Sequence, residues 1–170
     1  MLNTTDNTSS REKIFEEVHN GISSFMRIRE VDASRPWGGF FVIDEADTDR
    51  FIQEYFPHLT REQLGISGKL SPKILLVAPQ KRLSWQYHHR RAEIWKVIHG
   101  TVAVVTSYDD VERTQQILQP GDIIELQQGE RHRLVGLDHW GVIAEIWRHT
   151  DADNPSNEED IVRVQDDFGR

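Results

Sequence analysis

The stretch SWQYHHRRAE, residues 84–93, sets the fold expected of this chain, because it places candidate metal ligands at strand spacing. Gln86 and His88 are two residues apart, and side chains alternate across a β-strand, so both should point to the same face. Glu93 begins the next strand-like run and can return to the same point from a neighbouring strand. A fourth candidate, His132, follows a later strand-like run. These four side chains predict one site inside a β-barrel.

The predicted ligand set consists of two imidazoles, one carboxylate and one amide oxygen. The chain contains no Cys, so thiolate ligands are excluded. A mixed nitrogen and oxygen set suits one divalent metal ion, with zinc as the first choice and iron, manganese, cobalt or nickel as alternatives. The competing interpretation is an ordinary polar core, which is costly because buried polar groups need partners. His89 is one residue out of phase with His88 and should face the other side of the strand.

Further strand-like runs extend on both sides of this stretch. They are short, β-branched or aromatic, and they lie at 40–43, 73–77, 92–98, 101–107, 115–118, 122–126 and 141–147. Turn signals separate them, such as the Gly and Pro of QPG at 119–121. Many short strands predict a sandwich or a closed barrel, since closure removes unpaired sheet edges.

Two segments have helical rather than strand spacing. Residues 11–26 carry an apolar stripe, with Ser9 and Glu12 as a capping box, and should cover an end of the barrel or form a subunit contact. Residues 47–70 predict a helical insertion, with a second capping signal at Thr60. We expect a disordered lead-in at 1–10, a helical segment at 11–34 and one domain at 35–170 that contains the insertion.

Composition limits the functional classes. The chain has 170 residues, 37% of them hydrophobic, which fits one domain with a real core. The net charge of −8 argues against a nucleic-acid-binding surface. The polar start lacks the features of a signal peptide, and no apolar run is long enough for a membrane span. A cytoplasmic protein without membrane or nucleic-acid partners is therefore expected.

The motif spacing resembles that of a known superfamily. Residues 80–100 resemble the first cupin motif, G(X)5HXH(X)4E(X)6G, with Gln86 in the first His position, and residues 121–132 resemble the second, which ends at His132. The chain is more specifically similar to the C-terminal isomerase domain of type II mannose-6-phosphate isomerases. That similarity is carried by residues 35–38, 82–95, 159–163 and 167–170. It implies an all-β, single-domain cupin, a jelly-roll barrel with an N-terminal helix and a short helical insertion.

The resemblance also implies a metal-dependent aldose-ketose isomerase that acts on mannose 6-phosphate or a related phosphorylated sugar. Such a reaction moves a proton between C1 and C2, so it needs a cation beside the sugar oxygens and a base. Glu145, a carboxylate among apolar neighbours, is the candidate base, with a structural salt bridge as the alternative. Arg133, directly after His132, is the second catalytic candidate.

Four arginines are candidates for binding the phosphate, because a guanidinium matches a pair of phosphate oxygens. They are Arg82, Arg133, Arg163 and Arg170, and the bland alternative for each is a solvated surface group. Lys96 is an odd number of residues from Glu93 and should point away from the metal.

Two other functions remain open at this stage. One is a non-catalytic cupin that binds a sugar or sugar phosphate, and the other is a metal-dependent oxygenase of the cupin type. Because cupins generally pair through sheets or terminal strands, we also expect a homodimer.

Overall fold

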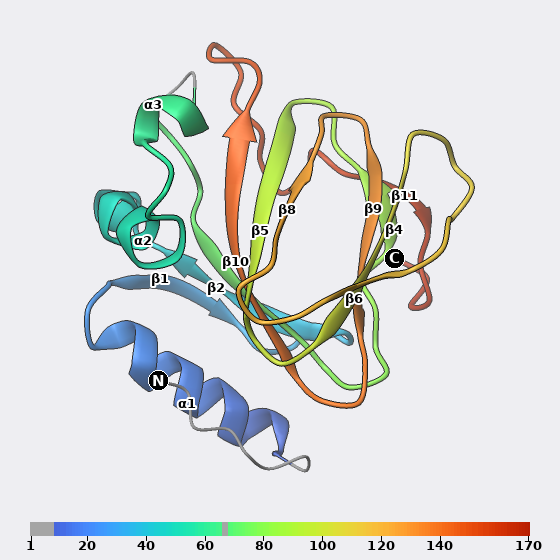
Figure 1. Cartoon of the computed structure of the whole chain (residues 1–170), viewed down its shortest axis with the longest axis horizontal. Helices are drawn as coiled ribbons and strands as arrows, with labels where there is room; N and C mark the ends of the chain where they lie inside the picture. Colours follow the sequence, from blue (N-terminus) through green and yellow to red (C-terminus); the bar gives the residue numbers. More distant parts are fainter. Residues whose placement is uncertain (1–8, 66–67) are drawn as a thin grey trace.

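The computed structural model of the protein describes residues 9–65 and 68–170, and the predicted lead-in at 1–10 falls almost wholly outside them. Two antiparallel sheets face each other, and the helices lie outside one of them (Figure 1). The larger sheet has the strand order β1 (Ile28–Asp32), β2 (Gly38–Ile43), β3 (Lys73–Val77), β10 (Gly141–His149), β5 (Arg91–His99), β8 (Ile123–Leu126). The smaller sheet has the order β11 (Val162–Gln165), β4 (Trp85–Tyr87), β9 (Arg131–Gly136), β6 (Val102–Ser107), β7 (Gln116–Leu118).

This architecture confirms the expected all-β, cupin-type barrel. The run predicted at 73–77 has the bounds of β3, and the other predicted runs differ from their strands by at most two residues at either end. Three strands were not predicted: β1, β9 and β11. Each contains only two large apolar side chains, so the apolar signal that indicates a strand is weak there.

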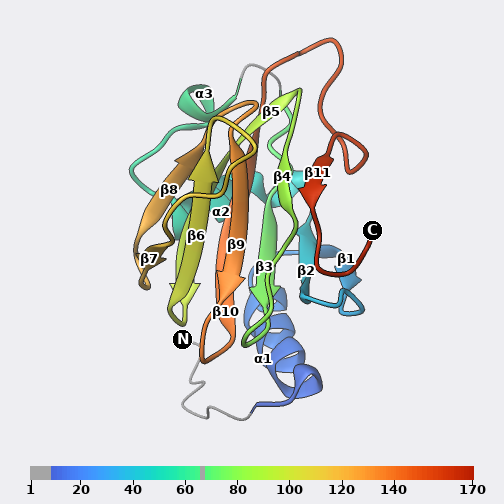
Figure 2. The ribbon, with the colours of Figure 1, turned by 90° about the vertical axis from the view of Figure 1, so that its right-hand side faces the viewer.

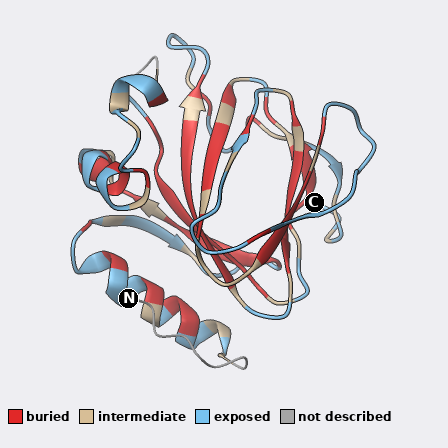
Figure 3. Ribbon diagram, viewed as in Figure 1, coloured by how far each residue is buried: buried red, intermediate tan, exposed pale blue. Residues whose placement is uncertain are grey.

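The larger sheet is covered on both faces. Along β10, Ile143 packs into the barrel interior, whereas its neighbours Val142 and Ala144 pack into a second core on the outer face. Figure 3 shows this arrangement as buried strands flanked by helices with buried inner faces. The barrel interior is therefore free to hold a site, because the helices stabilise the sheet from outside.

Helix α1 (Arg11–Ser23) packs its apolar stripe on this outer core. The buried stripe consists of Ile14, Phe15, Val18 and Ile22. The N-cap is Ser10, one residue after the predicted Ser9. The Ser10 side chain accepts the hydrogen bond from the Lys13 amide at 3.3 Å. The helix also ends three residues before the predicted position. The stripe is used within the chain, which leaves little of it for a subunit contact.

The segment predicted as a helical insertion contains η1 (Glu45–Asp47), α2 (Thr48–Tyr55) and α3 (Arg61–Leu64). The capping box at the start of α3 is confirmed, with reciprocal hydrogen bonds between Thr60 and Gln63. Like α1, helix α2 buries apolar side chains in the outer core. In the described part of the chain, none of these helices has the length and apolar character needed to cross a bilayer.

Candidate metal centre

Three of the four predicted ligands meet inside the barrel. The ligand atoms of His88, Glu93 and His132 all lie within 4.8 Å of one another, and all three side chains are buried. Gln86 on β4 pairs in register with His132 on β9, so the sheet itself aligns these two residues. Figure 2 faces the smaller sheet and shows β4 beside β9. Strand pairing thus joins residues that are more than forty positions apart in the sequence.

Backbone carbonyl groups fix the orientation and protonation of both histidines. The Nδ1 of His88 lies 2.7 Å from the Asp160 carbonyl oxygen, and the Nδ1 of His132 lies 3.0 Å from that of Glu130. A carbonyl oxygen only accepts, so each Nδ1 carries the proton and donates it. In a neutral ring, each Nε2 then keeps a lone pair, and both face Glu93. Histidines that bind metals are held in this way.

Two of the inward-facing ligand atoms have neither a hydrogen-bond donor nor a cation beside them in the described structure. Nε2 of His132 and Oε2 of Glu93 are 3.5 Å apart, and neither buried atom has a hydrogen-bond partner among the described residues. Two lone pairs that face each other in a buried site are unfavourable, and a cation between them would satisfy both. The donor set of His88, Glu93 and His132 therefore fits a divalent metal ion, although these ligands do not identify which metal.

Gln86 lies at the edge of this centre. Its side chain lines the same cavity as Glu93, and its Oε1 accepts a hydrogen bond from the Ser84 hydroxyl at 2.5 Å. An amide oxygen has a second lone pair, so this bond leaves room for a metal. The place of Gln86 as a fourth ligand stays a prediction.

Electrostatics favour the protonation states that a metal requires. Burial lowers the pKa of His88, which keeps the ring neutral. Burial alone would raise the pKa of Glu93, but the positive charge of Arg91 beside it helps to hold the pKa well below its usual value. A neutral imidazole and an ionised carboxylate are the forms that bind metal.

Arg91 is the residue of this centre that sequence reasoning missed. Its Nε donates to Oε1 of Glu93 at 2.8 Å, which leaves Oε2 for the metal. Its Nη1 donates to the Ser156 hydroxyl at 2.8 Å and to the Asn157 carbonyl at 3.0 Å. Arg91 lies two residues before Glu93 on the same strand, so the alternation rule used for Gln86 and His88 would have placed it on this face.

A cavity of about 170 Å³ adjoins the centre, and Glu145 lines it together with Gln86 and Glu93. The Glu145 carboxylate accepts hydrogen bonds from the indole N–H groups of Trp95, at 2.8 Å, and Trp147, at 2.7 Å. Burial, with the nearby charge of Glu93, raises the pKa of Glu145 to about 7. No ion pair engages Glu145 within residues 9–65 and 68–170. Two indole hydrogen bonds satisfy its carboxylate in place of the salt bridge that the sequence suggested as the alternative.

Two of the four predicted phosphate ligands, Arg163 and Arg170, line this cavity. Arg163 on β11 pairs in register with Gln86, whereas Arg170 is held by Asp166 at 2.9 Å. Burial and the neighbouring charge of Arg170 lower the pKa of Arg163. In the portion of the chain that is described, no hydrogen bond or ion pair engages the Arg163 guanidinium, which leaves its donors available to a ligand.

The other two, Arg82 and Arg133, do not line the cavity. Arg82 forms a two-point ion pair with Asp167, with contacts of 2.6 and 2.9 Å. Arg133 donates to the Leu83 carbonyl at 2.8 Å and to Glu112 at 2.7 Å. Consecutive residues on a strand point to opposite faces, so the position directly after His132 directs Arg133 away from the metal. Neither Arg82 nor Arg133 is therefore placed to bind a substrate in this cavity, and Arg133 is not placed to take part in catalysis there.

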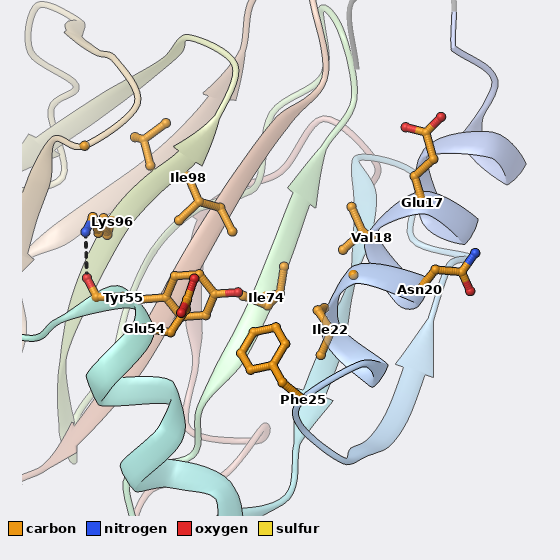
Figure 4. Close-up of a pocket in the computed structure, with 13 residues that line it drawn as sticks. Glu17, Val18, Asn20, Ile22, Phe25, Glu54, Tyr55, Ile74, Lys96 and Ile98 are labelled. Carbon is orange, nitrogen blue, oxygen red and sulfur yellow. Dashed lines mark hydrogen bonds between the residues drawn. The ribbon is translucent and has the colours of Figure 1, made fainter. Parts of the chain in front are cut away.

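A larger hollow, of about 690 Å³, lies on the opposite side of the larger sheet (Figure 4). Its walls include Val18 and Ile22 of α1, Phe25 directly after that helix, and Tyr55 at the end of α2. Lys96 donates from its Nζ to the Tyr55 carbonyl at 2.8 Å there, so it points away from the metal centre as expected. The hollow is separated from the candidate centre by the sheet.

Comparisons with known proteins agree with this geometry. The family described as "Mannose-6-phosphate isomerase C-terminal" matches residues 46–166. The xanthan biosynthesis protein XanB of Xanthomonas campestris is 31% identical over 116 residues, and the alginate biosynthesis protein AlgA of Pseudomonas aeruginosa is 29% identical over 100 residues. These matches cover 68% and 49% of this chain but only 23% and 21% of the relatives. The chain thus spans about a fifth of their length.

Solved structures share the fold at low sequence identity. The capsular polysaccharide assembling protein CapF of Staphylococcus aureus aligns with a TM-score of 0.54 at 12% identity, over 79% of this chain and 33% of that one. Vicilin of Corylus avellana (hazelnut) aligns with a TM-score of 0.54 at 17% identity, over 81% of this chain and 35% of that one. Both show a common barrel architecture and nothing further about activity.

Proposed function

Because this chain belongs to the family of the mannose-6-phosphate isomerase C-terminal domain, we propose that it is a metal-dependent isomerase of phosphorylated sugars. Mannose 6-phosphate is the first candidate substrate, and fructose 6-phosphate would be its product. The observation that carries the proposal is the triad of His88, Glu93 and His132 beside a cavity lined by Glu145, with unsatisfied lone pairs on Glu93 and His132.

The chemistry requires charge stabilisation at two sugar oxygens and a mobile proton. A bound divalent metal would stabilise the negative charge that develops on the oxygens at C1 and C2. Glu145 would take the proton from C2 of the aldose and return it to C1. Its raised pKa suits this role, since a group that titrates near neutral pH can both accept and donate a proton. The indole N–H groups of Trp95 and Trp147 hold its carboxylate in place.

The phosphate would bind at the arginine side of the cavity. Arg163 offers free donors there, and its pKa is lowered by burial and by Arg170, so an incoming dianion would relieve this repulsion. Arg35 lines the same cavity and adds a third guanidinium. This cluster supports a phosphorylated ligand over a neutral sugar.

Proton NMR of mannose 6-phosphate with zinc-loaded protein tests the proposal. The wild-type protein should form fructose 6-phosphate, and Glu145→Gln should lower kcat by about 100- to 10,000-fold because the base is lost. Glu125→Gln, which removes the same charge from an exposed position on β8, should keep wild-type activity. Zinc content and mannose 6-phosphate affinity of Glu145→Gln should stay within about threefold of wild type, since the substitution spares the triad and the arginines.

Two other outcomes would redirect the assignment. Thermal stabilisation by mannose 6-phosphate without any turnover would favour a sugar-phosphate-binding protein. Oxygen consumption would favour an oxygenase. Full activity of Glu145→Gln would exclude Glu145 as the base and leave the isomerase proposal standing.

A further inference from the structure

Lys73 is a buried cation of the cavity that has no role in the proposal so far. It begins β3, its side chain is only 7% exposed, and it lines the cavity beside the metal centre. It pairs in register with Glu145 on β10, so both residues face the barrel interior. A buried lysine needs a nearby anion or another compensating group, because an uncompensated buried charge is unfavourable. Because Lys73 lies in the cavity beside the candidate base, the anion that balances its charge can be a bound ligand.

An aromatic ring separates Lys73 from the metal centre. The ring centroid of Trp147 lies 3.7 Å from the guanidinium carbon of Arg91 and 4.0 Å from the Nζ of Lys73. Two cations this close to one centroid would overlap on a single face, so the indole lies between them. Arg91 contacts Glu93 directly, whereas the ion pair of Lys73 is with Glu158. A sugar that reacts at C1 and C2 beside the metal carries its phosphate at the far end of its carbon chain, where a cavity cation that is not paired with Glu93 can bind it.

The ion-pair partner of Lys73 is a weakly held carboxylate. Its Nζ contacts Glu158, which lies on the connection from β10 to β11 and lines the same cavity. The Glu158 side chain is 64% exposed, so water can solvate it when it leaves. An ion pair with one exposed partner contributes little to stability, and a competing anion can displace it.

We propose that Lys73 binds the phosphate of the substrate, and that Glu158 occupies Lys73 when no ligand is bound. Ligand binding then exchanges a carboxylate for a phosphate on the same ammonium group. This inference rests on the proposed function, since it takes a phosphorylated sugar as the ligand. A phosphate carries more charge and more acceptor oxygens than a carboxylate, so the exchange favours the ligand. Arg163, which lines the same cavity, supplies further donors.

Calorimetric titration of zinc-loaded protein with mannose 6-phosphate tests the exchange. Glu158→Gln should bind about two- to fivefold more tightly than wild type, because the competing carboxylate is gone. Glu159→Gln is the matched control: it removes the same charge from the adjacent exposed residue, which does not line the cavity, and should leave affinity unchanged. Lys73→Met should bind about 10- to 100-fold more weakly, since a charge-assisted hydrogen bond is lost. Titration with mannose, which lacks the phosphate, should not distinguish the variants.

A double variant separates a direct exchange from a general charge effect. In the Lys73→Met background, Glu158→Gln should no longer raise affinity, because the group for which both anions compete is absent. Should Lys73→Met fail to fold by circular dichroism, the comparison of Glu158→Gln with Glu159→Gln still decides the matter. Equal affinities of those two variants, or wild-type affinity of Lys73→Met, would overturn the exchange and leave the isomerase proposal intact. Absence of mannose 6-phosphate binding by the wild-type protein would overturn both.

Discussion

Two backbone carbonyl groups prepare the histidines of the metal centre. His132 is held by Glu130, two residues earlier on the chain, so its orientation is a local property. His88 is held by Asp160, more than seventy residues later, so its orientation depends on the connection between β10 and β11. The side chain of Asp160 also accepts from the backbone amides of His89 and Arg90, at 2.9 and 3.0 Å. A single residue of that connection thus fixes the start of the strand-to-turn segment that carries His88.

Adjacent histidines allow a matched test of the ligand assignment. His88→Ala should weaken zinc binding by more than about 100-fold, because loss of a direct ligand exceeds the 10- to 100-fold cost of losing an outer-shell partner. His89→Ala should bind zinc like wild type, since His89 is exposed and out of phase with the site. Competition of each variant against a chromogenic zinc chelator measures the affinities. Similar zinc affinities for the two variants would contradict the assignment of His88.

His149 predicts how stability changes with pH. It is buried, its Nδ1 accepts from the Ser156 amide at 2.9 Å, and its Nε2 lies 3.2 Å from the Ser71 hydroxyl. Burial, helped by Lys69 and Arg91 and opposed by Asp160, lowers the pKa of His149 from 6.5 to about 4. Between these values the unfolded chain binds the proton and the folded protein does not. The free energy of unfolding contributed by His149 is therefore constant above pH 6.5, falls as pH decreases from 6.5 to 4, and levels off below.

Urea unfolding at several pH values measures this contribution. His149→Asn cannot titrate but can still accept a hydrogen bond from the Ser156 amide. We expect the difference in stability between wild type and His149→Asn to shift against wild type as pH falls from 6.5 to 4. Stability curves that run parallel over this range would show that the pKa of His149 is the same in both states.

At the scale of elements, one short strand organises the site. β4 has three residues, yet it pairs with β9 on one side and β11 on the other. Through these pairings Gln86 is aligned with His132 and with Arg163. The strand is short because the next residues leave the sheet to position His88, which approaches the metal from the end of the strand. An element that is too short to be stable alone is held by its neighbours.

Two glycines in turns provide an element-scale prediction. Gly100 joins β5 to β6 with φ +73°, and a Cβ there would lie 2.3 Å from the Trp140 carbonyl oxygen. Gly121 joins β7 to β8 with φ +97°, and a Cβ there would meet nothing within 4 Å. Gly121→Ala should lower the free energy of unfolding by about 1–2 kcal/mol through backbone strain alone. Gly100→Ala should lower it further, because the Trp140 backbone must also move.

Chemical unfolding followed by fluorescence measures both variants. Equal destabilisation by the two substitutions would mean that the close approach to Trp140 does not constrain the turn.

At the scale of the whole molecule, the described part of the barrel leaves four sheet edges without a paired strand. β1 and β8 form the edges of the larger sheet in the described structure, and β11 and β7 form those of the smaller one. β1 is the longest of these four strands, and Val31 on it is 45% exposed. An unpaired edge with an exposed apolar side chain favours association, and each of the four edges carries one, so its greater length makes β1 the best surface for the expected homodimer.

Light scattering tests the dimer. The wild-type protein should have about twice the mass of the 19.8 kDa chain, and Val31→Lys should shift it toward the monomer, because charge on an edge strand opposes pairing. Ile117→Lys, at an exposed position on the opposite edge strand β7, is the control and should leave the mass unchanged. A wild-type monomer would exclude the dimer altogether.

The sequence by itself determined the faces of the strands. The two-residue period assigned Gln86 and His88 to the barrel interior and, counted from Glu93, Lys96 to the outside, whereas the run of apolar residues gave β3 its bounds. The same rule, fully applied, would also have placed Arg91 inside and Arg133 outside. These are consequences of the direction in which each Cβ leaves the chain, and that direction is a local property.

Only the tertiary structure decided which faces meet. The spacing of residues in the sequence does not reveal three contacts of the site. They are the pairing of Arg163 with Gln86, the contact of Lys73 with Glu158, and the hydrogen bond of His88 to the Asp160 carbonyl. Strand order depends on how the whole chain buries its two cores, which no single segment encodes. Local alternation therefore identified candidate ligands. Global packing determined the partners that orient these ligands and set their protonation states.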